Sequence, residues 1–131
     1  MTQEDKQLLF KDLCARLPYN MWVQYEEKEW LVVGYGHGRV LLLPSIFSSV
    51  AGPCPLIEDI KPYFRPMSSM TEEERREYDK LIAKCIYDPE AYFFENYNRL
   101  YDWLNAHHFD YRGLIPMGLA LEATEEMYKD E

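Results

Sequence analysis

Two adjacent histidines followed by an aspartate are the residues best suited to chemistry. His107, His108 and Asp110 combine imidazoles with a carboxylate, the ligands of many metal-dependent hydrolases. Neighbouring helical residues point about 100° apart, however, whereas helical histidines that share one ion are four residues apart. The four-residue partners here are Trp103 and Leu104, which are not metal ligands. The spacing therefore favours a helix end whose histidines pack on these side chains, and it predicts no metal and no other cofactor.

Two other stretches have only part of a functional motif. Gly34-Tyr-Gly-His-Gly38 is as rich in glycine as a phosphate-binding loop, but 39–43, which follow it, have a strand pattern where such a loop needs a helix. The serines of the loop 44–55 lack the Gly-x-Ser-x-Gly spacing of a nucleophile elbow. His37 could approach this loop across the end of a sheet, a possibility that the sequence leaves open. The chain is thus predicted to have no catalytic residue.

The histidines are predicted to end an amphipathic helix that organises the second half of the chain. Asp88-Pro89-Glu90 is a typical helix start, with Asp at the N-cap and Pro at the first helical position. At 100° per residue, four side chains fall on one stripe that is expected to face the core: Phe93, Tyr97, Leu100 and Leu104.

Aromatic residues are more abundant than a core of this size needs. The stretch Tyr92–Ile115 holds eight of the chain's twenty aromatic residues. Tyrosine and tryptophan are enriched at recognition surfaces, because they bury a large area at low entropic cost. The sequence therefore predicts a partner-binding surface made of Phe94, Tyr101, Trp103 and Tyr111.

The first half of the chain predicts a helix and a small sheet. Residues 1–17 have helical spacing, with Thr2 as the N-cap and Pro18 as the stop. Residues 19–61 are a β region. Its runs with strand patterns are 21–25, 30–35, 39–43 and a short candidate at 56–60. They indicate a small antiparallel sheet or partial barrel of three to four strands.

The second half predicts a helical pair over residues 71–108. Thr71-Glu-Glu-Glu74 is a capping box that starts the first of these helices. Its expected apolar face is Tyr78, Leu81, Ile82, Cys85 and Ile86. Residues 109–131 are expected to be an irregular acidic tail, frayed from residue 122. The chain is therefore predicted to be a single α+β domain, with an N-terminal helix, a sheet and a C-terminal helical pair.

Charge and composition limit the partners and the location. The net charge is −9, and residues 71–131 carry fifteen acidic against seven basic residues, a charge of −8. Direct nucleic-acid binding is therefore disfavoured, because phosphate contacts need clustered Lys and Arg. No apolar run approaches the roughly 18 residues of a membrane span. Three widely spaced cysteines and a charged N-terminus without an apolar signal segment predict a cytoplasmic protein.

Two segments resemble a known group of proteins. IKPYFRPMSSMTEEER, residues 60–75, and WLNAHHFDYRGLI, residues 103–115, are similar to sequences of short proteins from gut bacteria, their prophages and other mobile elements. The similarity extends over residues 60–80 and 100–128 and is weaker over the sheet region. It implies an intracellular accessory protein, and it brings no activity, cofactor or catalytic residue.

These observations predict a non-enzymatic protein that binds another protein or itself. Two alternatives stay open. One is a small metal-dependent hydrolase that uses His107, His108 and Asp110, which a cleft gathering His and Asp would favour. The other is an acidic nucleic-acid mimic that acts through residues 71–131, which a regular row of carboxylates on one exposed face would favour.

Overall fold

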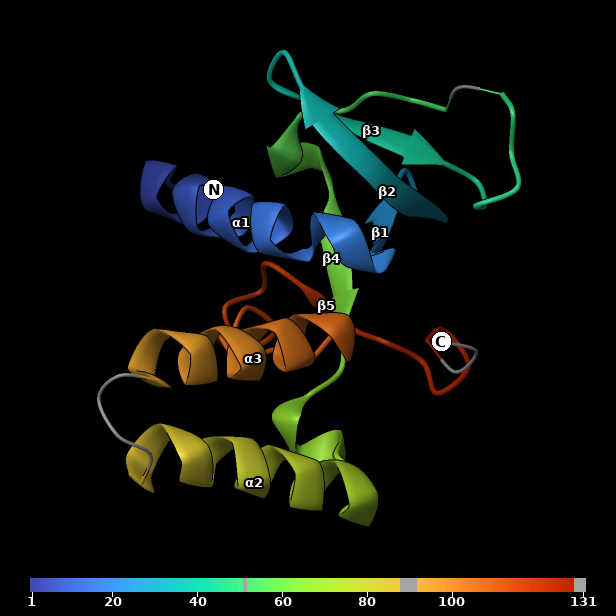
Figure 1. Ribbon diagram of the computed structural model, residues 1–131. Helices are drawn as coiled ribbons and strands as arrows, with labels where there is room; N and C mark the ends of the chain where they lie inside the picture. Colours follow the sequence, from blue (N-terminus) through green and yellow to red (C-terminus); the bar gives the residue numbers. More distant parts are fainter. Residues whose placement is uncertain (51, 88–91, 129–131) are drawn as a thin grey trace.

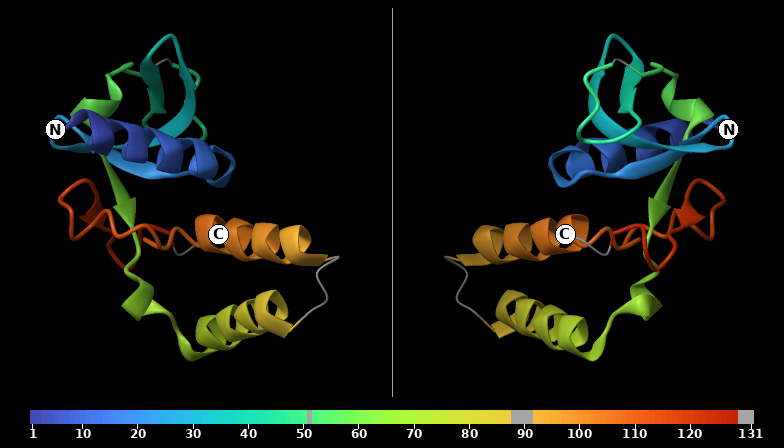
Figure 2. Two further views of the ribbon diagram at one scale, coloured as in Figure 1. Left: turned by 90° about the vertical axis from the view of Figure 1, so that its left-hand side faces the viewer. Right: turned by 90° about the vertical axis from the view of Figure 1, so that its right-hand side faces the viewer.

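The computed structural model describes residues 1–50, 52–87 and 92–128, and its ribbon is drawn in Figure 1 and Figure 2. The helices and strands are α1 (Gln3–Arg16), β1 (Trp22–Tyr25), β2 (Lys28–Gly36), β3 (Arg39–Leu43), β4 (Lys61–Phe64), α2 (Glu72–Tyr87), α3 (Phe93–Ala106) and β5 (Leu121–Glu122). An N-terminal helix, a mixed sheet and two C-terminal helices confirm the α+β class.

Helix α1 begins where the sequence predicts. The Thr2 hydroxyl accepts a hydrogen bond from the Asp5 amide at 3.0 Å, which satisfies one of the free amide groups at the helix start. Leu9 and Leu13 are buried against the sheet. A short 3-10 turn over Leu17–Tyr19 then leads into β1.

The predicted meander is confirmed, but the sheet is larger than expected. Strands β1, β2 and β3 pair antiparallel in succession. The described residues form a five-stranded sheet of order β3-β2-β1-β4-β5, instead of three to four strands. Its last pair, β4 with β5, is parallel, so the sheet is mixed. Strands β3 and β5 are its edges, which makes it an open sheet.

The fourth strand lies later in the chain than predicted. Residues 56–60 were expected to form it, but Ile57–Asp59 is a 3-10 turn and the strand is Lys61–Phe64. Proline argues against a sheet interior because it has no N–H to donate. Here Pro62 lies opposite Val23 of β1, in the half of β4 that pairs with β1 alone. The other half of β4 pairs with β5. Pro62 therefore does not interrupt a longer ladder of backbone hydrogen bonds.

The segment after α3 is irregular but closely packed. Phe109 and Leu114 are fully buried, and β5 continues the sheet. The Tyr128 hydroxyl donates to the Tyr63 carbonyl at 2.8 Å and accepts from the Trp22 amide at 2.9 Å. The prediction of a frayed tail is therefore wrong up to Tyr128, because these hydrogen bonds attach the segment to the sheet.

The predicted helical pair is confirmed. Glu74 N donates to the Thr71 hydroxyl at 3.1 Å and Thr71 N donates to the Glu74 carboxylate at 3.0 Å, so the capping box is complete. Leu81 and Ile82 of α2 pack against Leu100 of α3 and its neighbours. Ile86, expected on the same face, is exposed. The predicted start of the second helix at Asp88-Pro89-Glu90 lies outside the described residues.

Two hydrophobic clusters divide the molecule into layers. One cluster lies between α1 and the sheet, and the other lies between α2 and α3. In Figure 1 and both views of Figure 2, α3 lies between α1 and α2. The orientation of α3 therefore decides which of its side chains remain at the surface.

Removing the capping hydroxyl should weaken α2. We expect Thr71→Ala to lower the free energy of unfolding by about 1 kcal/mol, because the Glu74 amide loses its acceptor. Urea unfolding midpoints measure this loss. The control is Thr124→Ala, which changes an exposed threonine outside the helices. Equal midpoints for Thr71→Ala and the wild type would contradict a stabilising role of the capping box.

Candidate functional site

Five aromatic rings form a continuous row along α3 and the segment that follows it. We call the set Phe93, Phe94, Tyr97, Tyr101 and Tyr111 the aromatic row. The centroid of the Phe93 ring is 5.5 Å from that of Phe94 and 4.7 Å from that of Tyr97. Tyr101 continues the row at 6.4 Å from Tyr97 and 5.4 Å from Tyr111. These are the distances at which aromatic rings attract one another.

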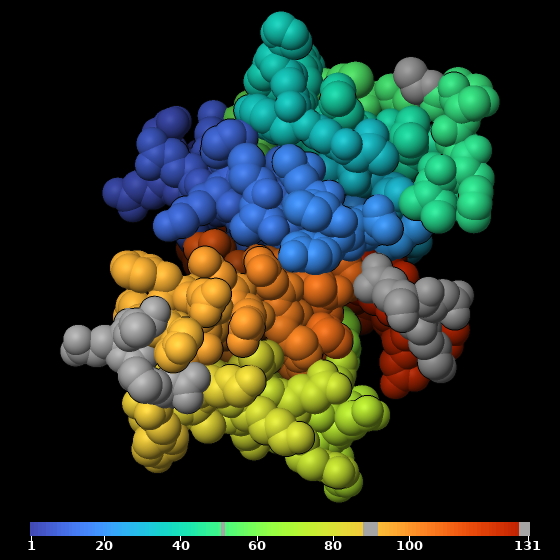
Figure 3. Space-filling view, in the orientation of Figure 1, coloured from blue at the N-terminus to red at the C-terminus, as the bar shows by residue number. Residues whose placement is uncertain are grey.

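Four of the five rings of the aromatic row lie at the surface, and Tyr111 is half-buried. Phe94 is 80% exposed, Phe93 47% and Tyr101 44%. Figure 3 shows the side chains of α3 at the surface between those of α1 and those of α2. Contiguous exposed apolar surface of this kind is typical of interaction sites in soluble proteins.

The prediction that Phe93 and Tyr97 face the core is wrong. Of the predicted stripe, Leu100 and Leu104 are buried, while the two aromatic members are exposed. The buried face of α3 instead begins at Asn96, whose side-chain amide donates to the Lys84 carbonyl of α2 at 3.3 Å.

A second buried asparagine lies near the other end of α3 and on the opposite side of the helix, because nine residues at 100° each place Asn105 about 180° from Asn96. The Asn105 side-chain oxygen accepts from the Tyr111 hydroxyl at 2.8 Å. Hydrogen-bonded asparagines can occupy a core. Asn96 is buried beside α2, whereas Phe93 and Tyr97, which the hydrophobic pattern assigns to the core, are exposed. Hydrophobicity at helical spacing does not reveal this difference.

The structure brings together three of the four predicted partner-binding residues. Phe94, Tyr101 and Tyr111 belong to the aromatic row. Trp103 lies on the α2 side, where its indole N–H donates to the Glu77 carboxylate at 2.9 Å and its ring stacks on Phe109 at 5.7 Å.

The sequence prediction missed two members of the row, Phe93 and Tyr97. Their spacing at positions 93, 97 and 101, four residues apart, was the available signal.

The side chains of the predicted metal-binding residues His107, His108 and Asp110 contact different parts of the molecule. His107 Nδ1 lies 2.9 Å from the Trp103 carbonyl, and its ring packs on Trp103 with centroids 4.4 Å apart. The His108 ring is buried and stacks on Tyr128 at 3.6 Å. The Asp110 carboxylate accepts from two backbone amides, those of 114 and 115, at 2.8 and 2.9 Å. Within the described ranges no group of three His, Cys, Asp or Glu residues could hold a metal ion.

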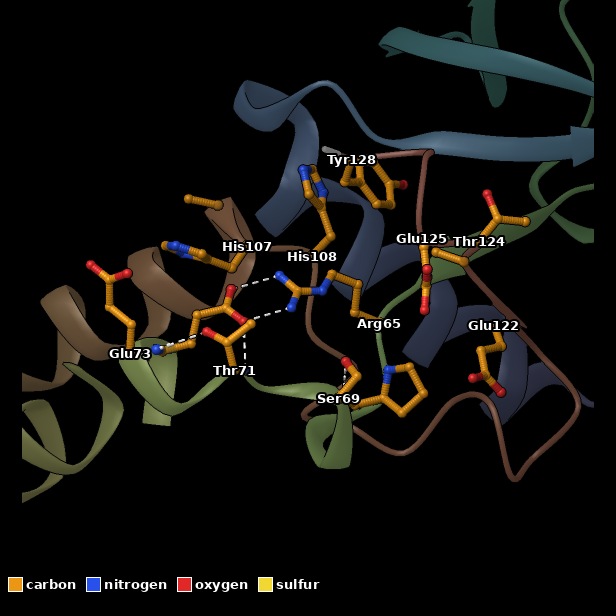
Figure 4. A pocket seen from close by; sticks show the side chains of 14 residues that line it. Arg65, Ser69, Thr71, Glu73, His107, His108, Glu122, Thr124, Glu125 and Tyr128 are labelled. Atoms are coloured by element: carbon orange, nitrogen blue, oxygen red, sulfur yellow. Dashed lines mark hydrogen bonds and ion pairs between the residues drawn. The ribbon is translucent and has the colours of Figure 1, made fainter. Parts of the chain in front are cut away.

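A pocket of about 790 Å³ opens beside the histidines, between the start of α2, the end of α3 and the C-terminal segment. Figure 4 shows Arg65 at its centre. The Arg65 guanidinium donates two hydrogen bonds to the carboxylate of Glu74. Both hydrogen bonds of this pair measure 2.7 Å, and the guanidinium also lies 4.3 Å from the Phe109 ring. Arg65 and Glu74 thus join the end of β4 to α2, which favours a structural role for this pair.

Helix α2 does not present a row of carboxylates. Its acidic residues Glu72, Glu73, Glu74, Glu77 and Asp79 alternate with Arg75, Arg76, Lys80 and Lys84. Glu74 is paired with Arg65, and Glu72 lies 3.9 Å from Arg76. The mixed charge gives the nucleic-acid mimic no support on this helix.

Comparison with models of known families, with curated proteins and with solved structures finds no match for this chain. Among the described residues, no helix has both the length and the apolar composition needed to cross a membrane.

The Arg65–Glu74 pair should make stability depend on pH. Hydrogen bonds from Arg65, with further contributions from the Thr71 amide, Arg65's charge and His107, lower the pKa of Glu74 to about 2 from 4.5. The folded state thus favours the carboxylate. Its contribution to stability is present above pH 4.5 and is lost as the pH falls towards 2.

We therefore expect the difference in unfolding free energy between wild type and Glu74→Gln to shrink as the pH falls through this range. Urea titrations at several pH values measure it. Glu73→Gln is the control, because Glu73 forms no ion pair with Arg65. A difference that is constant with pH would show that the charge of Glu74 does not stabilise the fold.

Proposed function

We propose that this chain is an intracellular accessory protein that acts by binding another protein through the aromatic row. The observation that carries the proposal is the exposure of four neighbouring rings, Phe93, Phe94, Tyr97 and Tyr101, on a helix that is otherwise anchored by buried leucines and asparagines. Such rings leave apolar surface in contact with water, and a partner that covers them removes this cost.

The energies available to such an interface are large enough to matter. Full burial of a ring such as Phe contributes about 1.5–3 kcal/mol relative to full exposure. Phe94 is the most exposed member of the row, so it has the most to gain from a partner. Ring–ring contacts also restrict the rotamers of the row before binding, which reduces the entropy lost on association. A few aromatic anchors of this type commonly dominate binding energy.

Sequence observations support a bacterial origin and an intracellular location for this protein. The resemblance of residues 60–80 and 100–128 to short proteins of gut bacteria and their mobile elements favours an accessory role encoded by a prophage or mobile element. The free cysteines Cys14, Cys54 and Cys85 are compatible with a reducing cytoplasm. Self-association through the same aromatic row is a variant of the proposal that the experiment below separates.

Truncating the aromatic row should abolish capture of the partner. We expect Phe94→Ala to lose a protein that the wild type retains in pull-downs from a gut-bacterial host, quantified by mass spectrometry. Phe47→Ala is a matched control, because Phe47 is 89% exposed and lies in the loop after β3, outside the row. Light scattering against concentration identifies the case in which the partner is a second copy.

The proposal fails if Phe94→Ala and Phe47→Ala retain the same proteins and the same oligomeric state as the wild type. Loss with both variants would also contradict it, since binding would then not depend on the row.

A further inference from the structure

A groove between α1 and α3 continues the aromatic row. Its volume is about 470 Å³, and it is lined by Lys11, Ala15, Tyr101, Asn105, Tyr111 and Arg112. Tyr101 and Tyr111 belong to the row as well, so one wall of the groove is aromatic. In Figure 3, side chains of α1 and α3 adjoin one another near the middle of the face on which α3 is exposed.

The groove is basic in an acidic chain. Its lining contains two cationic side chains, Lys11 and Arg112, and no acidic one, whereas the whole chain has a net charge of −9. Lys11 is exposed and forms no ion pair within the described ranges. The groove is therefore a local exception to the net charge of the chain.

Donors around the groove exceed the acceptors that the chain supplies. Arg112 Nε donates to Asp12 at 3.1 Å, but the same carboxylate also accepts from Arg16 at 2.8 and 3.2 Å. Arg16 lies against the ring of Tyr111, and its Nη1 is buried without a hydrogen-bond partner in the described part of the chain. The other nearby carboxylate, Asp110, is occupied by backbone amides. Arg16 is fully buried and does not line the groove, so an acceptor added in the groove would meet Lys11 and Arg112, and Arg112 shares its internal acceptor Asp12 with Arg16.

We propose that the groove receives an acidic side chain of the protein that docks on the aromatic row. The partner segment then presents apolar residues to the row and an Asp or Glu to Lys11 and Arg112. This inference rests on the proposed function of the row and adds the chemistry of the partner. Charge-assisted hydrogen bonds to a carboxylate are stronger than neutral ones, and one carboxylate between two cations gains attraction from both.

The acidity of the rest of the chain determines the position of this partner. Residues 71–131 carry a charge of −8, so an acidic side chain is on average repelled by this half of the chain and is attracted to Lys11 and Arg112 of the groove. Repulsion from wrong positions is a common source of specificity. The same acidity disfavours a nucleic acid, because a strand of phosphates would extend beyond the two cations onto the acidic surface.

Small probes test the charge preference without knowledge of the partner. Phenylacetate, phenylacetamide and phenethylamine share one ring and differ in charge. In amide NMR titrations of the full chain, we expect phenylacetate to shift the signals of Lys11, Ala15 and Arg112. We expect it to bind about fivefold more tightly than phenylacetamide, the effect of one partly exposed ion pair, with phenethylamine weakest.

Matched lysine variants locate the effect. Lys11→Gln should remove the preference for phenylacetate, whereas Lys80→Gln, which neutralises an exposed lysine on α2, should preserve it. Both variants change the net charge equally, so a preference lost in both would be a general charge effect and would overturn the inference.

Equal binding of the three probes, or no phenylacetate shifts at the groove, would also overturn the inference. Displacement of phenylacetate by inorganic phosphate more readily than by acetate would assign the groove to a phosphate ligand and contradict the carboxylate proposal. The pull-down comparison of Phe94→Ala with Phe47→Ala decides the role of the aromatic row separately, so failure of the groove and failure of the row are distinguishable.

Discussion

A buried ion pair in α1 joins the layers of this protein. Asp12 and Arg16 are fully buried, and the Arg16 guanidinium donates to Asp12, donates to the Phe109 carbonyl at 2.7 Å and lies 3.9 Å from the Phe64 ring. Burial raises the pKa of the Asp12 carboxyl, and the neighbouring Arg16 and Arg112 act in the opposite direction. Burying two charges is costly unless each is paired and hydrogen-bonded, and removing one partner of such a pair typically costs about 3–5 kcal/mol. The pair therefore requires α1, β4 and the segment after α3 to stay together.

This constraint fixes the end of α3 and, with it, the exposed face of the helix. The Arg65 amide donates to the His108 carbonyl at 2.8 Å, and the Asp110 amide donates to the Arg65 carbonyl at 2.9 Å, so residues 108–110 continue beside β4. With its end held there and its leucines packed against α2, the helix buries Asn96 and Asn105 and leaves four rings exposed: Phe93, Phe94, Tyr97 and Tyr101. The aromatic row and the basic groove beside it are both consequences of that orientation.

Local interactions were predictable from the sequence, and long-range ones were not. The caps at Thr2 and Thr71 involve partners three residues away, and the meander depends on neighbouring strands, so local patterns were sufficient. Strand β4 contains Pro62, which usually argues against a sheet interior. The contact of Arg16 with Phe109 spans 93 residues. An arginine in the last turn of a helix commonly lies in solvent near the negative end of the dipole, so its burial had no sequence signal. Two of the exposed rings, Phe93 and Tyr97, were predicted to face the core, because the packing of α3 depends on contacts with distant segments that helical spacing does not contain.

The central claim is that the exposed rings of the aromatic row contribute little to the stability of the fold, whereas the buried leucines of the same helix contribute much of it. Urea unfolding of the Phe94→Ala, Tyr101→Ala double variant beside Leu104→Ala tests it most directly. The account predicts that the double variant loses about 1 kcal/mol or less, as surface changes usually do. Leu104→Ala, which opens a cavity in the buried cluster, should lose about 2–5 kcal/mol. A double variant as unstable as Leu104→Ala would show that the rings belong to the core, and it would contradict the account.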